Sequence, residues 1–389
     1  MIKSGTASAI HEALIAKNEC MIAFLRRLVE TESHSHDQSA LSRVLGLLED
    51  KWKSLGWVTR RIRGHKSGGH LFARPARRPR HRPVQVMIGH CDTVWPPETL
   101  QTMPIRFSED RLHGPGIFDM KAGLTQMVFA METIQELSIQ PQVTPVVFVN
   151  SDEEVGSRES TPWIRRLARL ADRALILEPP LEGKLKTTRK GIGRFTIAVK
   201  GKPAHAGLDP GKGASAILEL SHLIQKLFAL NDLERGISVN VGKIDGGISA
   251  NVIAPESKAV IDVRVPTQDD AADITERIYG LKSENPDVEI HVEGRIGRPP
   301  MEATPRNRRL WEQARAAGQA LGMELQESSA GGGSDGNTTS QYTATLDGLG
   351  TVGDGAHAVH EHIEAFHIVE RTALLAVLLL APPTSPAKT

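Results

Sequence analysis

The chain has 389 residues, which is too long for one ordinary hydrophobic core and indicates two domains. Hydrophobic residues make up 40% and charged residues 24%, as in globular proteins, and a formal net charge of +1 provides no overall field to attract nucleic acid or membranes. Only Cys20 and Cys91 are present, which excludes a disulfide-rich scaffold and fits a reducing compartment.

The N-terminal segment lacks the pattern of a secretory signal. Glu12, Lys17 and Arg26 are among the charged residues that interrupt any apolar run there. No uncharged apolar run approaches the roughly 18–20 residues that a transmembrane helix needs. We therefore expect a cytoplasmic protein that has no membrane contact.

The first half of the chain alternates between predicted helices and strands. Helices are expected over 9–30 and 38–55, the second ending at Gly56. Short apolar runs before His90, Glu153 and Glu178 predict buried strands. The apolar spacing over 120–137 predicts a further helix, with Asp119 favoured at its N-terminus by the helix dipole. This alternation predicts an α/β fold with a central sheet flanked by helices.

The pattern changes near residue 183 and predicts a separate α+β unit. We expect a catalytic domain over 1–182 and 296–389, interrupted by a lid domain over 183–295. A helix over Asn307–Leu321 belongs to the returning part. The strands and helices expected in the inserted domain are Arg194–Val199, Ala214–Leu230, Ser238–Val241, Ala259–Val265 and Asp269–Leu281.

Side chains that bind metals follow the predicted strands and turns. In an open α/β sheet, ligands bind at the carboxyl ends of the strands. Imidazole and carboxylate groups gathered there are typical of a zinc site. The sequence therefore predicts a metallohydrolase, and the candidate ligands are His90, Asp119, Glu154, Glu178 and His357.

Two acidic residues beside these candidates suggest supporting roles. Asp92 shares a strand face with His90 and can accept its second ring proton, although the pair could equally be ordinary strand-end polarity. Glu153 adjoins Glu154, and dividing the roles lets one of them bind metal while the other takes a proton from a metal-bound water molecule. The alternative for this pair is an exposed helix start. Cys91 faces away from His90 and is expected to be a buried structural thiol.

The glycine-rich stretch Gly114–Gly123 could be a simple turn capped by Asp119. A nucleotide-binding loop fits less well, because Asp119 occupies the third position where glycine is required.

Seven segments in order along the chain carry a resemblance to the aminoacylase/carboxypeptidase G family of dinuclear zinc hydrolases. The stretches Arg189–Gly191 and Gly333–Asn337 and the loop of His205 look most similar to its glutamate carboxypeptidase branch. The segments are His90–Thr93, Gly116–Gly123, Asp152–Gly156, Leu177–Pro179, Gly201–Gly207, Gly332–Asn337 and Gly355–Ile363.

The resemblance implies that Asp119 bridges two Zn²⁺ ions, for which Co²⁺ or Mn²⁺ could substitute. His90 and Glu178 would complete one site, and Glu154 and His357 the other. Glu153 is then the implied general base and Asp92 the partner of His90. His357 is chosen because it precedes Glu361 by the family spacing, which leaves His360 and His362 as surface or rim residues.

The inserted domain would supply the remaining catalytic and binding groups. By resemblance, His205 reaches the active site of a partner subunit and stabilises the oxyanion, which implies a homodimer. Asn251 and Arg264 match positions that hold the substrate carboxylate, and Gly333 and Ser334 lie in a loop that approaches the substrate. From composition alone, His205 and Arg264 would be solvated surface groups and the glycine run a flexible linker.

The implied reaction is release of a C-terminal amino acid, glutamate in particular, from N-acyl or peptide conjugates such as folates. One alternative is an N-acyl-amino-acid deacylase resembling acetylornithine deacetylase or a desuccinylase. A more remote one is a zinc-binding homologue without turnover. Residues 60–82 contain nine Arg or Lys and no acid, but Phe72 is the only aromatic residue, so a solvated hairpin is favoured over a nucleic-acid site.

Overall fold

The computed structural model describes residues 4–79 and 82–384, which form two compact units. The first unit comprises the chain up to Thr187, Ala303–Ser329 and the residues from Ser334 onward. The second comprises Thr188–Glu302 and Ala330–Gly333. The second unit is thus inserted in the sequence of the first, and it also includes part of the glycine run.

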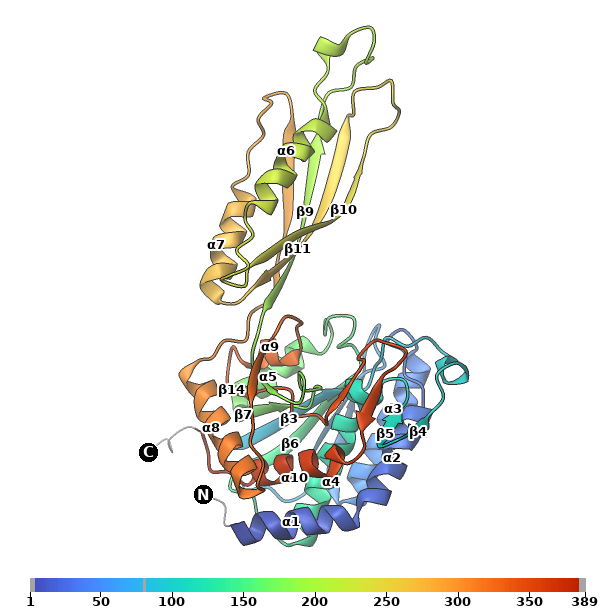
Figure 1. The fold of residues 1–389 in the computed structure, drawn as a ribbon, viewed down its shortest axis with the longest axis vertical. Helices are drawn as coiled ribbons and strands as arrows, with labels where there is room; N and C mark the ends of the chain where they lie inside the picture. The colour runs from blue at the N-terminus through green and yellow to red at the C-terminus, as the bar shows by residue number, and fades with distance from the viewer. Residues whose placement is uncertain (1–3, 80–81, 385–389) are drawn as a thin grey trace. The chain divides into compact units, whose positions relative to one another are not determined.

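A six-stranded mixed sheet forms the centre of the first unit, in the order β1-β2-β6-β3-β7-β14 (Figure 1). Strands β6, β3, β7 and β14 run parallel, whereas β1 and β2 form an antiparallel hairpin at one edge. The strands are β1 (Trp57–Ile62), β2 (His70–Pro75), β3 (Val84–His90), β6 (Thr144–Asn150), β7 (Ala171–Ile176) and β14 (Ala344–Leu346).

Helices cover both faces of this sheet. A large apolar cluster joins one face to most of the helices, while α5 packs on the opposite face against Val86, Ile88 and Phe148. The helices are α1 (Ser4–Ala16), α2 (Asn18–Glu30), α3 (Gln38–Ser54), α4 (Ala122–Glu136), α5 (Thr161–Leu170), α8 (Pro305–Ala320), α9 (Asp335–Thr339) and α10 (His367–Leu379).

The central strand β3 is buried along its whole length. Met87 faces the larger cluster, whereas Val86 and Ile88 face α5. A strand covered on both sides appears in the sequence as a continuous apolar run. This explains why the segment before His90 carries so few polar residues.

Short strands and turns complete the first unit. A four-stranded sheet has the order β15-β16-β5-β4, and β13 pairs with β8. These elements are β4 (Arg106–Ser108), β5 (Arg111–His113), β8 (Leu185–Arg189), β13 (Glu327–Ala330), β15 (Gly353–Asp354) and β16 (His362–Glu364), with the turns η1 (Thr99–Gln101) and η2 (Ile117–Lys121).

The second unit is a four-stranded antiparallel sheet in the order β10-β11-β9-β12, with α6 and α7 packed on one face (Figure 1). Its core consists of the inward residues of the strands and the apolar stripes of both helices. The elements are β9 (Gly191–Lys200), η3 (Pro210–Lys212), α6 (Ala216–Phe228), β10 (Ser238–Gly246), β11 (Glu256–Val265), α7 (Gln268–Tyr279) and β12 (Glu289–Arg298).

The predicted α/β fold class is confirmed, and the differences are local. The single helix expected over 9–30 is wrong, since it is two helices that meet at Lys17, whose amide bonds to the Leu14 carbonyl. Strand β10 continues well past Val241 because a bulge between Val241 and Lys243 restores its pairing with β11. Within the described residues, no helix combines the length and apolar character needed to cross a membrane.

Candidate metal centre

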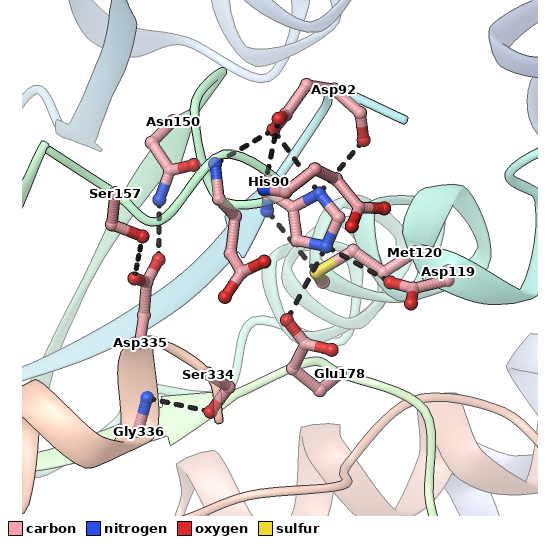
Figure 2. A network of polar contacts seen from close by, with 12 residues as sticks. His90, Asp92, Asp119, Met120, Asn150, Ser157, Glu178, Ser334, Asp335 and Gly336 are labelled. Carbon is pink, nitrogen blue, oxygen red and sulfur yellow. Dashed lines mark hydrogen bonds and ion pairs between the residues drawn. The ribbon is translucent and has the colours of Figure 1, made fainter. Parts of the chain in front are cut away.

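Neighbouring parallel strands bring three of the predicted ligands together. His90 ends β3 and is paired with Asn150, the last residue of β6. Glu153 and Glu154 follow β6 directly, and Glu178 follows β7 on the other side of β3. Parallel strands expose their carboxyl ends at one edge of the sheet, so these side chains are brought to the same place. Figure 2 shows His90 and Glu178 pointing towards each other there.

Asp119 lies between the two imidazoles. Its Oδ1 is 3.1 Å from His90 Nε2, and its Oδ2 is 3.5 Å from His357 Nε2. Glu178 Oε1 is 3.5 Å from His90 Nε2, and Glu154 Oε2 is 3.0 Å from His357 Nε2. The five side chains therefore form two groups that share one carboxylate.

These distances fit a pair of divalent cations. Two ligand atoms bound tetrahedrally to one Zn²⁺ lie about 3.4 Å apart, since each is about 2.0–2.2 Å from the ion. The separations between an imidazole nitrogen and a carboxylate oxygen within the two groups are 3.0–3.5 Å. Three carboxylates and two imidazoles are also the donor types that zinc and similar ions prefer. The residues present thus fit two cations bridged by Asp119.

The electrostatics of the centre reflect an excess of carboxylates. Burial alone would lower the pKa of His90, but hydrogen bonds with Asp119, Asp92 and Glu178 raise it well above its usual value. The hydrogen bond with Glu154 raises the pKa of His357 to about 9. Burial, together with nearby Asp119, raises the pKa of Glu154. Positive charge is therefore strongly favoured at this position.

Asp92 makes hydrogen bonds with several residues of the centre. Its carboxylate accepts hydrogen bonds from the backbone amides of Glu153 and Glu154, each at 3.2 Å, and from Ser35 Oγ at 2.9 Å. His90 Nδ1 is 3.0 Å from the Asp92 carbonyl and 3.4 Å from its carboxylate. Asp92 therefore supports the acidic pair as well as the imidazole, which the sequence pattern did not indicate.

Glu153 lies beside the centre. One of its carboxylate oxygens belongs to a group with ligand atoms of His90 and Glu178, all within 4.8 Å of one another. Its amide is held by Asp92. The adjacent acids thus take different places, Glu154 against His357 and Glu153 towards His90 and Glu178.

A non-helical turn, rather than a helix N-terminus, presents Asp119. Helix α4 begins only at Ala122, and Asp119 has φ −113° and ψ 96° within η2. The prediction that the helix dipole positions Asp119 is therefore wrong. Gly116 starts the turn at φ +69°, and a Cβ there would lie 2.4 Å from Thr93, so glycine is required. Backbone amides of the turn bond to the side chain of Glu361.

In the sequence, Glu361 indicates only which histidine is the ligand, yet in the structure it is a fully buried part of this site. Burial raises its pKa to about 7. The acidic residue four positions after a candidate ligand was the sign in the sequence that Glu361 belongs to this site.

His360 is exposed as expected, but His362 is buried against His113, at 5.1 Å between ring centroids, because β16 pairs with β5. The surface position expected for His362 is wrong.

Cys91 lies in the main apolar cluster, as its facing predicted. Burial raises the pKa of its thiol. The thiol is therefore in its neutral form and is not a candidate ligand.

Ser334 is committed to a helix cap. Its hydroxyl donates to Asp347 Oδ2 at 2.5 Å and accepts from the Gly336 amide at 2.9 Å. Its own amide bonds to Asn337 Oδ1. The side chain is fully buried in the first unit.

Four of the predicted residues belong to the second unit: His205, Asn251, Arg264 and Gly333. The backbones of Ala206 and Asn251 are hydrogen-bonded, so His205 and Asn251 are neighbours. His205 Nδ1 accepts from the amides of Gly207 and Leu208 at 3.1 and 3.2 Å. The ring proton of neutral His205 is consequently on Nε2.

Arg264 lies at the other end of this sheet. It is paired with Ile192 near the start of β9, whereas His205 follows the end of β9 at Lys200. At about 3.3 Å per residue, the strand from 192 to 200 alone spans roughly 26 Å. The Arg264 guanidinium bonds to Asp262 at 2.7 and 3.2 Å and to the Gly331 carbonyl at 3.3 Å.

The basic segment forms the hairpin of β1 and β2 at an edge of the sheet, as expected, although residues 80–81 lie outside the described residues. Charged side chains on an edge strand discourage pairing with other chains. The arginines of β1 thus have a structural explanation.

Comparison with known proteins decides the family. The model of peptidase family M20/M25/M40 matches residues 86–381. The chain belongs to this family. Carboxypeptidase G2 of Pseudomonas sp. (strain RS-16) is 28% identical, over 97% of this chain and 94% of that protein. Succinyl-diaminopimelate desuccinylase of Delftia acidovorans is 26% identical, over 82% of this chain and 87% of that protein.

Solved structures support the same fold. Aminopeptidase PepT from Bacillus cereus superposes with a TM-score of 0.78 at 20% identity, covering 93% of this chain and 98% of that chain. The resemblance stated from the sequence motifs is confirmed by the M20 match. As an M20 protein, the chain is a hydrolase of the carboxypeptidase and amidohydrolase type, and it carries a candidate metal centre.

Proposed function

We propose that the protein is a dinuclear zinc carboxypeptidase that releases a C-terminal amino acid, glutamate in particular, from N-acyl or peptide conjugates such as folates. The observation that carries the proposal is the position of Asp119 between the imidazoles of His90 and His357, with the Glu153 carboxylate alongside. Two bound cations would polarise the scissile carbonyl and increase the acidity of a water molecule.

The chain supplies the proton transfers and the charge stabilisation. Glu153 takes a proton from the attacking water and returns it to the leaving amine. The Nε2–H group of His205 donates to the developing oxyanion. Asp92 keeps Glu153 and Glu154 in their separate places through their amides.

Arg264 is proposed to bind the C-terminal carboxylate of the substrate together with Asn251 of the second copy, because Asn251 lies beside His205 at the other end of the sheet. Of the five N–H donors of a guanidinium, Arg264 uses three on Asp262 and Gly331 in the described part of the chain. The Asp262 contact also fixes the orientation of the guanidinium plane. An oriented fork favours a carboxylate over a neutral substrate end.

The spacing within the second unit supports a dimer. Arg264 and His205 of one chain are separated by most of the length of β9, far more than an N-acyl amino acid spans. A substrate held by Arg264 therefore needs His205 from a second copy. We propose that the active protein is a homodimer in which each site takes its oxyanion donor from the partner.

A deacylase is the second candidate. The desuccinylase relative covers most of the chain at nearly the same identity as the carboxypeptidase relative, so the acyl group is not decided by overall similarity. Both reactions use the same amide cleavage and differ in which half of the substrate is recognised.

A substrate panel tests the proposal. The zinc-loaded protein is incubated with folate and N-acyl glutamates on one side, and with N-acetylornithine and N-succinyl-diaminopimelate on the other. Mass spectrometry identifies the released products. Glutamate release from folate supports the carboxypeptidase assignment. Cleavage confined to the acetyl or succinyl substrates would replace it with the deacylase, and cleavage of none would leave a non-catalytic zinc protein.

A further inference from the structure

Glu361 is a buried carboxylate that accepts four hydrogen bonds. Its Oε1 accepts from the amides of Phe118 and Asp119, each at 3.0 Å. Its Oε2 accepts from the Gly116 amide at 2.9 Å and from Trp95 Nε1 at 2.8 Å. The residue is completely buried, so water does not compete for these donors.

The backbone of Glu361 adds to the same connection. Its carbonyl accepts from the Gly114 amide at 3.3 Å, and its own amide donates to the Ala358 carbonyl at 2.9 Å. The second bond closes the turn 358–361, which directly follows the turn 355–358 that contains His357. One residue thus joins the segment that carries His357 to the turn of Asp119, which is distant in the sequence.

Trp95 brings in a third segment. Trp95 lies a few residues after His90 in the sequence. Between them, Asp92 and Thr93 are hydrogen-bonded to the segment 33–35. Glu361 therefore connects its own segment, which carries His357, to the segments that carry His90 and Asp119.

We propose that Glu361 is a positioning residue that sets the spacing of the two cation sites by fixing Asp119 relative to His357. The inference rests on the dinuclear centre of the proposed function. Glu361 touches neither substrate nor cation in this role. It acts through the backbone amide of Asp119 and through the turn 358–361 that directly follows His357.

Replacing one acceptor oxygen of Glu361 with an N–H donor makes the positioning role testable. Both oxygens of Glu361 face N–H donors, so an amide at this position would direct its NH₂ group at two further donors in either orientation. Glu361→Gln should therefore displace the Asp119 turn while nearly preserving volume. Loss of a group that supports metal ligands typically weakens metal affinity about 10–100-fold.

The experiment is a titration of metal-free protein with Co²⁺, followed by its visible absorption and by competition with a chelator. Glu219→Gln is the matched control, because Glu219 is a buried carboxylate that accepts from the amides of Glu284 and Asn285 in the second unit. Thermal unfolding of each metal-free variant records the general stability cost of the exchange.

Glu361→Gln is expected to weaken Co²⁺ binding at least tenfold and to alter the absorption spectrum, whereas Glu219→Gln leaves both unchanged. Wild-type Co²⁺ affinity and spectrum in Glu361→Gln would overturn the inference, even if the variant unfolds at a lower temperature. Equal weakening in both variants would also overturn it. Wild-type protein that binds no Co²⁺ would instead contradict the proposed function.

Glu361→Asp provides a second variant if Glu361→Gln does not fold. It keeps both acceptor oxygens but withdraws them by one methylene, so it cannot reach all four donors. The same weakening of Co²⁺ binding supports the positioning role, and unchanged binding rejects it.

Discussion

The Asp335 carboxylate accepts a hydrogen bond from the side-chain amide of Asn150 at 2.5 Å, across 185 residues of sequence (Figure 2). Its other oxygen accepts from Ser157 Oγ at 2.6 Å. Asn150 ends β6, and Ser157 closes the turn that contains Glu153 and Glu154. A buried acid at the start of α9 therefore holds both ends of the segment that presents the acidic pair.

Replacing Asp335 with alanine should destabilise this segment. The Asn150 amide and the Ser157 hydroxyl would lose a buried acceptor, at about 1–3 kcal/mol for each unsatisfied group. We expect the free energy of unfolding to fall by about 2–4 kcal/mol in urea denaturation. Asp335→Asn, which keeps one acceptor oxygen, should lose less. Equal stability of wild type and Asp335→Ala would show that the contact contributes nothing.

Replacing Glu153 with glutamine should separate catalysis from cation binding. The amide cannot accept a proton, and loss of a general base typically lowers kcat about 10²–10⁴-fold. The backbone contact of residue 153 with Asp92 is unaffected, so the cation content should remain that of wild type. Steady-state kinetics with glutamate release and elemental analysis measure the two quantities. Turnover at the wild-type rate would remove Glu153 from the role of base.

The fold and most of the metal centre could be predicted because they depend on local patterns. The run before His90 is apolar because β3 is buried on both faces, and this marks the strand end and its ligand together. The apolar run of β6 marks the position of Glu153 and Glu154 in the same way, since both follow its end within four residues.

What could not be predicted depends on contacts between distant segments. Asp119 resembled a helix cap in the sequence, but its turn is held by Glu361, 242 residues away. The hydroxyl of Ser334 donates to Asp347, a contact that the glycine run around Ser334 did not indicate. Such hydrogen bonds leave no periodicity in the sequence, since only the folded chain brings donor and acceptor together.

Glu159 should make stability depend on acid pH. Hydrogen bonds from Ser67 and the backbone amides of residues 65–67 outweigh burial and lower the pKa of Glu159 to about 2. A depressed pKa contributes stability that is complete above the unfolded value near 4.5 and is lost as the pH falls towards 2. Urea denaturation of metal-free protein should therefore show wild type more stable than Glu159→Gln at pH 7, with the difference shrinking below pH 4.5.

The control for this measurement is Glu312→Gln. Glu312 forms an exposed pair with Arg315 on α8, and such pairs contribute little to stability. A wild-type advantage over Glu159→Gln that stayed constant down to pH 2 would contradict the assignment, because the stabilising charge would then not be that of Glu159.

Mixing two inactive variants should restore activity if His205 acts on the partner's site. In a mixed dimer of His205→Ala and Glu153→Gln, one site receives Glu153 from the first chain and His205 from the second. Random exchange of subunits would give about a quarter of the wild-type rate, because half of the dimers are mixed and each has one complete site. Glu153→Gln mixed with His357→Ala is the matched control, since both residues belong to the centre of one chain and no mixed dimer has a complete site. If native mass spectrometry confirms the exchange of subunits but glutamate release is not recovered, His205 either takes no part in the reaction or acts in the site of its own subunit. The second possibility conflicts with the length of β9 between His205 and Arg264, so it would also require a different residue to bind the substrate carboxylate.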